Sequence, residues 1–101
     1  MMTTGTTSGN SSPQGHVIVE FLGVPRLRTG CSRCVARAGS LRNVLAQVQQ
    51  QFPHWQDLLD DSGGLAPWYQ LATETHGFVH DFELCVAPGE TVIILSADVG
   101  G

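Results

Sequence analysis

The chain has 101 residues, of which 42% are hydrophobic, and its formal charge is −4. A chain of this length forms one domain with a small core, which argues against a deep active-site cavity and against an independent enzyme. The acidic charge argues against nucleic-acid binding, which depends on neutralising phosphates. No apolar run approaches the roughly 20 residues that cross a bilayer, so we expect no membrane partner.

Charge placement and cysteine content indicate the setting in which the protein works. All the cations are arginines between Arg26 and Arg42, whereas every acid except Glu20 lies at or beyond Asp57. The arginines form either a solvated surface or a local patch for an anion or a partner. The N-terminus lacks the pattern of a signal peptide, and the odd number of cysteines does not suit a disulfide framework. We therefore expect a cytoplasmic protein with reduced thiols.

The chain begins with a polar segment, and the sequence that follows it predicts a hairpin. Residues 1–15 are rich in Thr, Ser and Gly, and we expect them to be disordered because they cannot form a core. Residues 16–22 predict an apolar strand that is central in its sheet and buried on both faces. Residues 23–30 predict a connection bracketed by glycines, and residues 31–38 predict an edge strand that completes the hairpin.

The best-defined element is a helix that follows Ser40, whose hydroxyl can cap the first turn. Pro53 ends this helix, because the residue before a proline is displaced from the helical conformation. Apolar residues recur between them at helical spacing and predict the buried face: Leu41, Val44, Leu45, Val48 and Phe52. The residues predicted for the outer face are Asn43, Gln47 and Gln50.

The remaining elements are short. Residues 54–65 predict a loop with one helical turn at 55–59, and residues 87–90 predict a type II turn from their proline and glycine. The further predicted strands are 68–74, 78–79, 82–86 and 91–95, of which the last is apolar and central. The first and last strands can pair in parallel if the helix crosses one face of the sheet. The order therefore predicts an α+β roll in which a mixed sheet wraps one main helix.

The sequence ends with Val99, Gly100 and Gly101 shortly after the last predicted strand. Two residues without a Cβ can enter a narrow channel in a partner enzyme, where the terminal carboxylate is the only reactive group. A carboxylate becomes a good electrophile once it is activated, for example as an acyl adenylate. This ending is typical of a protein whose own C-terminus is the substrate, although fraying or a cloning scar also leaves glycines at chain ends.

The order of four segments resembles the β-grasp sulfur-carrier family, the ubiquitin-like group that includes the small subunit of molybdopterin synthase and the thiamine-pathway sulfur carrier. The segments are 20–23 with Arg26 and Gly30, 40–45 through 52–53, 88–92, and 99–101. The resemblance implies a ubiquitin-like β-grasp domain at 16–96 and a flexible tail at 97–101. Residues 96–98 read Ser-Ala-Asp, where the family often has prolines.

The resemblance also implies a function. An E1-like adenylating enzyme would use ATP to adenylate the carboxylate of Gly101, and sulfur from a donor protein would then displace AMP to leave a thiocarboxylate. Gly100 would give clearance in the partner's channel, and Val99 would contribute to docking. The chain would be a protein co-substrate with no catalytic residue and no bound cofactor of its own. It would deliver sulfur to a large synthase subunit or another acceptor, with molybdopterin biosynthesis as the expected pathway.

Other functions stay open from the sequence. Sulfur transfer to thiamine, an amino acid or tRNA would use the same tip, and so would conjugation as a ubiquitin-like modifier. The absence of lysine excludes chains linked through the protein's own lysines. Cys31 and Cys34 form a C-x-x-C pair that could instead hold zinc or act as a redox dithiol. Their place in a predicted strand puts them on opposite faces, which argues against both uses.

The remaining candidate residues have expected roles in packing. Cys85 lies between apolar residues and predicts a small core side chain. Four aromatic residues are also expected to pack in or near the core: Trp55, Trp68, Tyr69 and Phe78. Any of them that is exposed beside the tail would belong to a partner-docking face, because aromatic residues are enriched at interfaces.

Overall fold

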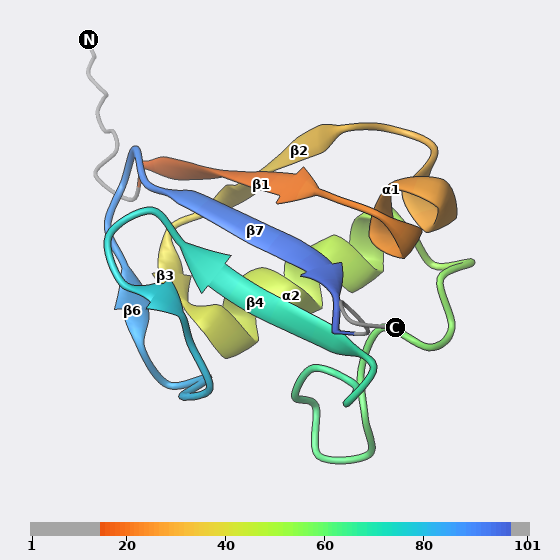
Figure 1. Cartoon of the computed structure of the whole chain (residues 1–101). Helices are drawn as coiled ribbons and strands as arrows, with labels where there is room; N and C mark the ends of the chain where they lie inside the picture. The colour runs from red at the N-terminus through yellow and green to blue at the C-terminus, as the bar shows by residue number, and fades with distance from the viewer. Residues whose placement is uncertain (1–14, 98–101) are drawn as a thin grey trace, which may run out of the picture.

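The computed structural model describes residues 15–97 of the chain. The strands are β1 His16–Phe21, β2 Arg33–Arg37, β3 Gly39–Ser40, β4 Tyr69–Thr73, β5 Gly77–Phe78, β6 Cys85–Val86 and β7 Thr91–Ser96, and the helices are α1 Val24–Thr29 and α2 Leu41–Gln51. The main sheet has the order β2-β1-β7-β4-β5, and β3 pairs with β6 in a second, two-stranded sheet (Figure 1). Predicted disorder at 1–15 falls outside the described residues except for Gly15.

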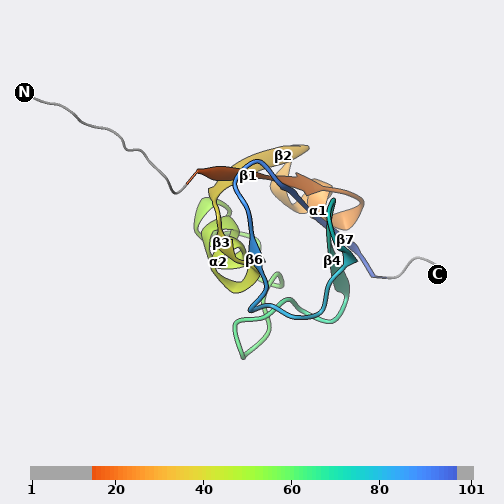
Figure 2. The same ribbon diagram turned by 90° about the vertical axis from the view of Figure 1, so that its left-hand side faces the viewer.

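The first and last strands lie side by side and in parallel, as the sequence predicts. Val19 is paired with Val92 and Phe21 with Ile94 at the centre of the sheet. β2 is antiparallel to β1 and forms an edge of the sheet, which confirms the predicted hairpin and edge strand. Figure 2 shows α2 on one side of the sheet, together with β3 and β6. The predicted α+β mixed sheet around one main helix is therefore confirmed.

The core lies between α2 and one face of the sheet. The fully buried sheet residues alternate along the central strands: Val17, Val19, Phe21, Val92 and Ile94. The intervening residues Ile18, Glu20 and Ile93 are only partly buried. The prediction that the first strand is buried on both faces is therefore wrong, because the fold places a helix on one face of this sheet and leaves the other open. The predicted central position of the last strand is confirmed.

The helix α2 begins as predicted. The Ser40 hydroxyl accepts a hydrogen bond from the backbone N–H of Asn43 at 3.1 Å. Two further N–H groups of the first turn, those of Leu41 and Arg42, donate to the carbonyl oxygens of Leu84 and Phe82. The segment before β6 thus supplies acceptors that the helix itself cannot, which explains why a second small sheet forms beside this end of α2.

The connection predicted at residues 23–30 is in fact the helix α1. Pro25 stands in its first turn, where a missing N–H costs nothing, and Gly30 closes it in the left-handed conformation with φ 73°. Pro25 is its one buried residue. A helix this short and exposed has no apolar stripe, so hydrophobic periodicity does not reveal it.

The segment between α2 and β4 also differs from the prediction. The expected helical turn at 55–59 is absent, and the described chain there forms turns instead. Trp55 is 1% exposed and packs edge-on against Phe21, with ring centroids 6.0 Å apart. Burial of this indole holds the loop against the core without a helix. The turn at 87–90 is confirmed, because Gly89 has φ 89° and the Glu90 N–H donates to the Ala87 carbonyl.

Candidate functional site at the base of the C-terminal tail

The site predicted from the sequence is the tail, and Val99, Gly100 and Gly101 lie outside the described residues. The structure does show where the tail begins. β7 is flanked by β1 and β4, so it cannot move without breaking two ladders. Beyond it, the Ala97 N–H donates to the carbonyl oxygen of Trp68 at 2.9 Å. The chain therefore leaves the sheet from a strand that is paired on both edges.

The helix α1 holds the same point from the other side. The Val24 N–H donates to the Ser96 hydroxyl at 3.1 Å, across 72 residues of sequence. Gly23 has φ 69°, and a Cβ at this position would lie 2.9 Å from the Ser96 oxygen. A residue with a side chain would therefore be strained and would push Ser96 away. Gly23 allows the end of β1 to approach the end of β7.

Exposed apolar side chains surround this exit. Leu27 is 81% exposed, Trp68 is 53% exposed and Val24 is 38% exposed. We call these three residues the tail-base surface. Two hollows share Val24 and Ser96: one of about 700 Å³ runs along α1 past Leu27, and one of about 200 Å³ reaches Trp68. The surface is therefore continuous across the point where the tail begins.

A hydrogen-bonded network underlies the tail-base surface. The Trp68 indole N–H donates to the backbone carbonyl of Asp57 at 3.1 Å. The Asp57 carboxylate accepts from the Tyr69 hydroxyl at 2.9 Å, and this hydroxyl accepts from the Trp55 indole at 3.1 Å. Arg28 approaches the same carboxylate at 3.9 Å. Trp68 is consequently held in one orientation while much of its ring faces solvent.

The four aromatic residues therefore divide into two groups. Trp55 and Tyr69 are buried in the core, as predicted, whereas Trp68 and Phe78 are exposed. Trp68 lies beside the tail and fulfils the stated condition for a docking face. Phe78 of β5 pairs with Ala72 near one end of β4, whereas Ser96 of β7 pairs with Tyr69 at the other end. Phe78 therefore lies at the opposite end of β4 from the tail.

The cysteine pair does not form a second site. Cys31 and Cys34 both pack against the core, so the prediction of opposite faces is wrong; β2 begins at Arg33, and Cys31 precedes the alternating segment. Burial, and then the charge of Cys31, raises the pKa of the Cys34 thiol to about 11. A thiol with a pKa this high is a poor nucleophile near neutral pH. Cys85 is exposed, which corrects its predicted place in the core.

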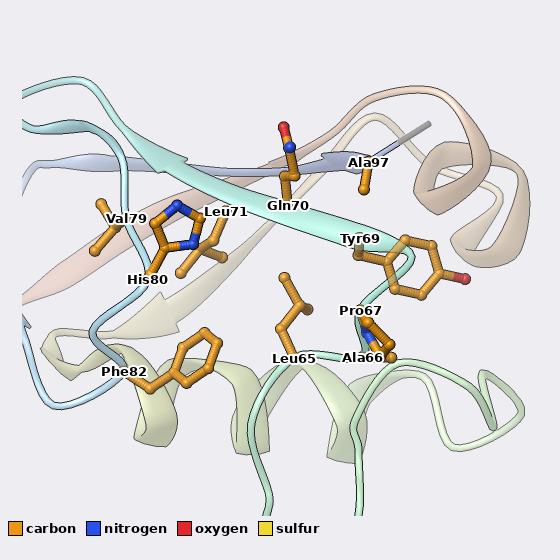
Figure 3. Close-up of a pocket in the computed structure, with 10 residues that line it drawn as sticks. All are labelled: Leu65, Ala66, Pro67, Tyr69, Gln70, Leu71, Val79, His80, Phe82 and Ala97. Carbon is orange, nitrogen blue, oxygen red and sulfur yellow. The ribbon is translucent and has the colours of Figure 1, made fainter. Parts of the chain in front are cut away.

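A cavity of about 220 Å³ opens along the outer edge of β4 (Figure 3). Leu65 and Phe82 lie on the α2 side of the strand, and Gln70 and Ala97 lie on the other side. Among the described residues that line it, His80 is the one imidazole or carboxylate, so these residues supply no acid–base pair. Within residues 15–97, no group of three or more His, Cys, Asp or Glu side chains could hold a metal ion.

Together these features define a ubiquitin-like β-grasp fold, with parallel β1 and β7 and a helix held against the sheet. Small archaeal modifier protein 1 of Haloferax volcanii has a similar structure, with a TM-score of 0.73 and 12% identity over 86% of this chain and all of its own. A putative molybdopterin converting factor subunit 1 of Pyrococcus furiosus has a TM-score of 0.64 and 11% identity over 81% of this chain and 97% of its own.

Urm1 of Trypanosoma brucei is also similar, with a TM-score of 0.57 and 22% identity over 90% of this chain and all of its own. No protein-family model and no curated relative matches the sequence. At these identities the similarity defines the fold. In the part of the chain that the structure describes, neither helix has the length and apolar character needed to span a bilayer.

Proposed function

We propose that the protein is a sulfur carrier of the cytoplasm whose C-terminal carboxylate is the reacting group. An E1-like enzyme joins the Gly101 carboxylate to AMP and releases pyrophosphate from ATP. A sulfide equivalent from a donor protein then attacks the acyl carbon and displaces AMP, which leaves a thiocarboxylate. The chain supplies the substrate group and its presentation, and the partner supplies the catalytic groups.

The observation that supports this proposal is the placement of the tail's base. The last strand is central in the sheet, and both Ser96 and Ala97 are held by hydrogen bonds from or to neighbouring segments. A narrow Gly-Gly end that starts from a fixed point loses less entropy on entering a channel than one that starts from a loose strand. The similarity to a molybdopterin converting factor subunit favours molybdopterin biosynthesis as the pathway, with a large synthase subunit as acceptor.

A second candidate is a ubiquitin-like modifier, which the similarity to small archaeal modifier protein 1 favours. Both functions begin with adenylation of the same carboxylate and differ in the acceptor. A modifier forms an amide between Gly101 and a lysine of another protein, and this bond survives thiol reductants. A carrier gives up its sulfur and returns to the carboxylate without such a conjugate.

Intact-mass spectrometry tests the proposal directly. The protein is incubated with ATP, a sulfur donor and each E1-like adenylating enzyme of the source organism in turn. We expect a mass increase that corresponds to replacement of one oxygen by sulfur, and we expect deletion of Gly101 to abolish it. The deletion removes none of the described core residues, so it should leave the thermal unfolding temperature unchanged.

The matched control is a truncation at the other end. Removal of residues 1–14 shortens the chain but leaves the tail intact, so this variant should gain sulfur as the full chain does. Sulfur loading that survives deletion of Gly101, or that no E1-like enzyme of the organism produces, would refute the proposal.

A further inference from the structure

Building on the proposed function, we propose that the tail-base surface of Val24, Leu27 and Trp68 is the docking site for the adenylating enzyme. The complementary surface on that enzyme would be an apolar pocket with acidic groups at its rim. This assignment is separate from the chemistry at the tip, because it concerns the body of the domain.

The length of the tail limits where the enzyme can sit. Four residues follow Ala97 in the sequence. A fully extended chain spans at most about 3.6 Å per residue, so the carboxylate of Gly101 lies within roughly 14 Å of Ala97. An enzyme that encloses the carboxylate and a nucleotide must therefore cover the domain around the exit of the tail. Val24, Leu27 and Trp68 are exposed apolar residues that line the hollows at that exit.

Trp68 has the properties of a residue that dominates binding energy. Tryptophan is enriched among such residues, and a side chain that is already ordered loses little entropy on binding. The bond from its indole to the Asp57 carbonyl fixes the ring before any partner arrives. Asp57 is itself tied to the core through Tyr69 and Trp55. The structure therefore holds an apolar surface in water at a fixed position beside the tail.

The arginines of α1 indicate the charge expected on the partner. Arg26 and Arg28 lie in the last turn of this helix, and Arg26 lines the same hollow as Val24 and Leu27. Asp57 faces Arg28 at 3.9 Å and offsets part of its charge, whereas Arg26 forms no ion pair among the described residues. Acidic groups on the enzyme would complement Arg26, while its apolar pocket takes Leu27 and Trp68.

The test separates docking from chemistry by steady-state kinetics. ATP–pyrophosphate exchange by the E1-like enzyme is measured as the concentration of this protein is varied. We expect Trp68→Ala and Leu27→Ser each to raise the KM for the protein about tenfold or more, with kcat changed much less. Trp68→Phe, which keeps an aromatic ring, should recover part of the loss.

Phe78→Ser is the matched control. Phe78 is 62% exposed, similar to Trp68, but it lies at the opposite end of β4. Its KM should therefore stay within about twofold of the unchanged protein, as expected for a residue outside the binding centre. Thermal unfolding of each variant shows whether the domain is intact. We expect Leu27→Ser to fold normally, because the Leu27 side chain is exposed.

The outcomes distinguish the two proposals. If the unchanged protein supports exchange but Trp68→Ala and Leu27→Ser keep the original KM, the docking assignment is wrong and the proposed function stands. A rise in KM for Phe78→Ser alone would place the enzyme on the far part of the sheet and would also overturn the assignment. Absence of exchange with every E1-like enzyme would remove the proposed function and this inference together.

Discussion

A single carboxylate organises the loop between α2 and β4. One oxygen of Asp60 accepts hydrogen bonds from the Ser62 N–H at 2.8 Å, the Ser62 hydroxyl at 2.6 Å and the Gly64 N–H at 3.0 Å. The hydrogen bond from the Ser62 side chain is the largest cause that lowers the pKa of Asp60 below its ordinary value of 3.8. The ionised carboxylate therefore fixes the backbone of a loop that has no helix to order it.

This arrangement predicts a specific pH dependence for Asp60→Asn. The folded-state pKa lies below the unfolded value, so the carboxylate stabilises the fold above about pH 4 and loses this effect as the pH falls through the folded-state pKa. We expect the variant to unfold at a lower temperature than the unchanged protein near pH 7, and the difference to shrink toward pH 2. Thermal unfolding followed by circular dichroism across this range measures it.

Asp61→Asn is the control for this pH series, because Asp61 is the neighbouring exposed acid in the same loop. Its unfolding temperature near pH 7 should stay close to that of the unchanged protein. A difference for Asp60→Asn that stays constant from pH 7 to pH 2 would show that the loop does not depend on the ionised carboxylate.

At the scale of elements, α2 protects the edge strand β2. The Gln47 amide accepts from the Arg37 N–H at 2.7 Å and donates to the Arg37 carbonyl at 3.1 Å, and Gln51 donates to the Val35 carbonyl at 2.9 Å. Gln47 is only 8% exposed, which corrects its predicted place on the outer face of the helix. These glutamines occupy backbone groups that an unprotected edge would offer to another chain.

Replacing Gln47 should open this edge. In Gln47→Leu the backbone N–H and C=O of Arg37 lose their partners, so we expect a loss of about 1–3 kcal/mol in the free energy of unfolding. We also expect self-association that increases with protein concentration. Urea denaturation and sedimentation velocity measure the two effects. Gln50→Leu makes the same chemical change at an exposed position of α2 and should leave both nearly unchanged; equal behaviour of the two variants would contradict the edge-protection role.

The sequence predicts those elements whose signals are local. Ser40 and Pro53 mark the two ends of α2 correctly, and the apolar runs identify the first and last strands as central. The parallel pairing of these two strands follows from the rule for crossover connections and not from a local signal. The amphipathic pattern misplaces Gln47, because it treats every glutamine as a surface residue, whereas the burial of Gln47 depends on where β2 passes. The hydrophobic pattern does not reveal α1, because a helix with one buried residue has no periodicity, although Pro25 and Gly30 are helix start and stop signals.

The sequence predicts one part of the candidate site, the Gly-Gly end, but not the surface beside it. The Gly-Gly end can be read directly from the sequence, as can the possibility of an aromatic docking face. Which aromatic residue lies beside the tail depends on the register that pairs Tyr69 with Ser96. The approach of Val24 to Ser96 depends on a contact across 72 residues. Long-range pairing of this kind leaves no local pattern, so the tail-base surface requires the structure.

For the molecule as a whole, the uneven charge of the sequence becomes an uneven charge of the surface. The arginines lie on α1, β2 and the start of α2, whereas most acids lie beyond residue 56, in the loops and turns around β4. Only some of these charges meet across the fold, as in the pairs of Arg28 with Asp57 and Arg42 with Glu83. The protein therefore keeps an electric dipole that can orient it as it approaches a charged partner.

We expect this dipole to affect adenylation through the rate of encounter. An acidic rim on the enzyme would attract Arg26, and salt would screen the attraction, since the Debye length falls from about 10 Å at 0.1 M to about 3 Å at 1 M. Raising the NaCl concentration should therefore lower kcat/KM for the protein several-fold while kcat stays nearly constant. Arg26→Gln should lower kcat/KM at low salt and weaken its dependence on salt. Arg37→Gln, a change of equal charge at the end of β2 away from the tail, should keep most of the dependence. A salt dependence that both variants reduce equally would mean that net charge alone, rather than the charge beside the tail, governs the encounter.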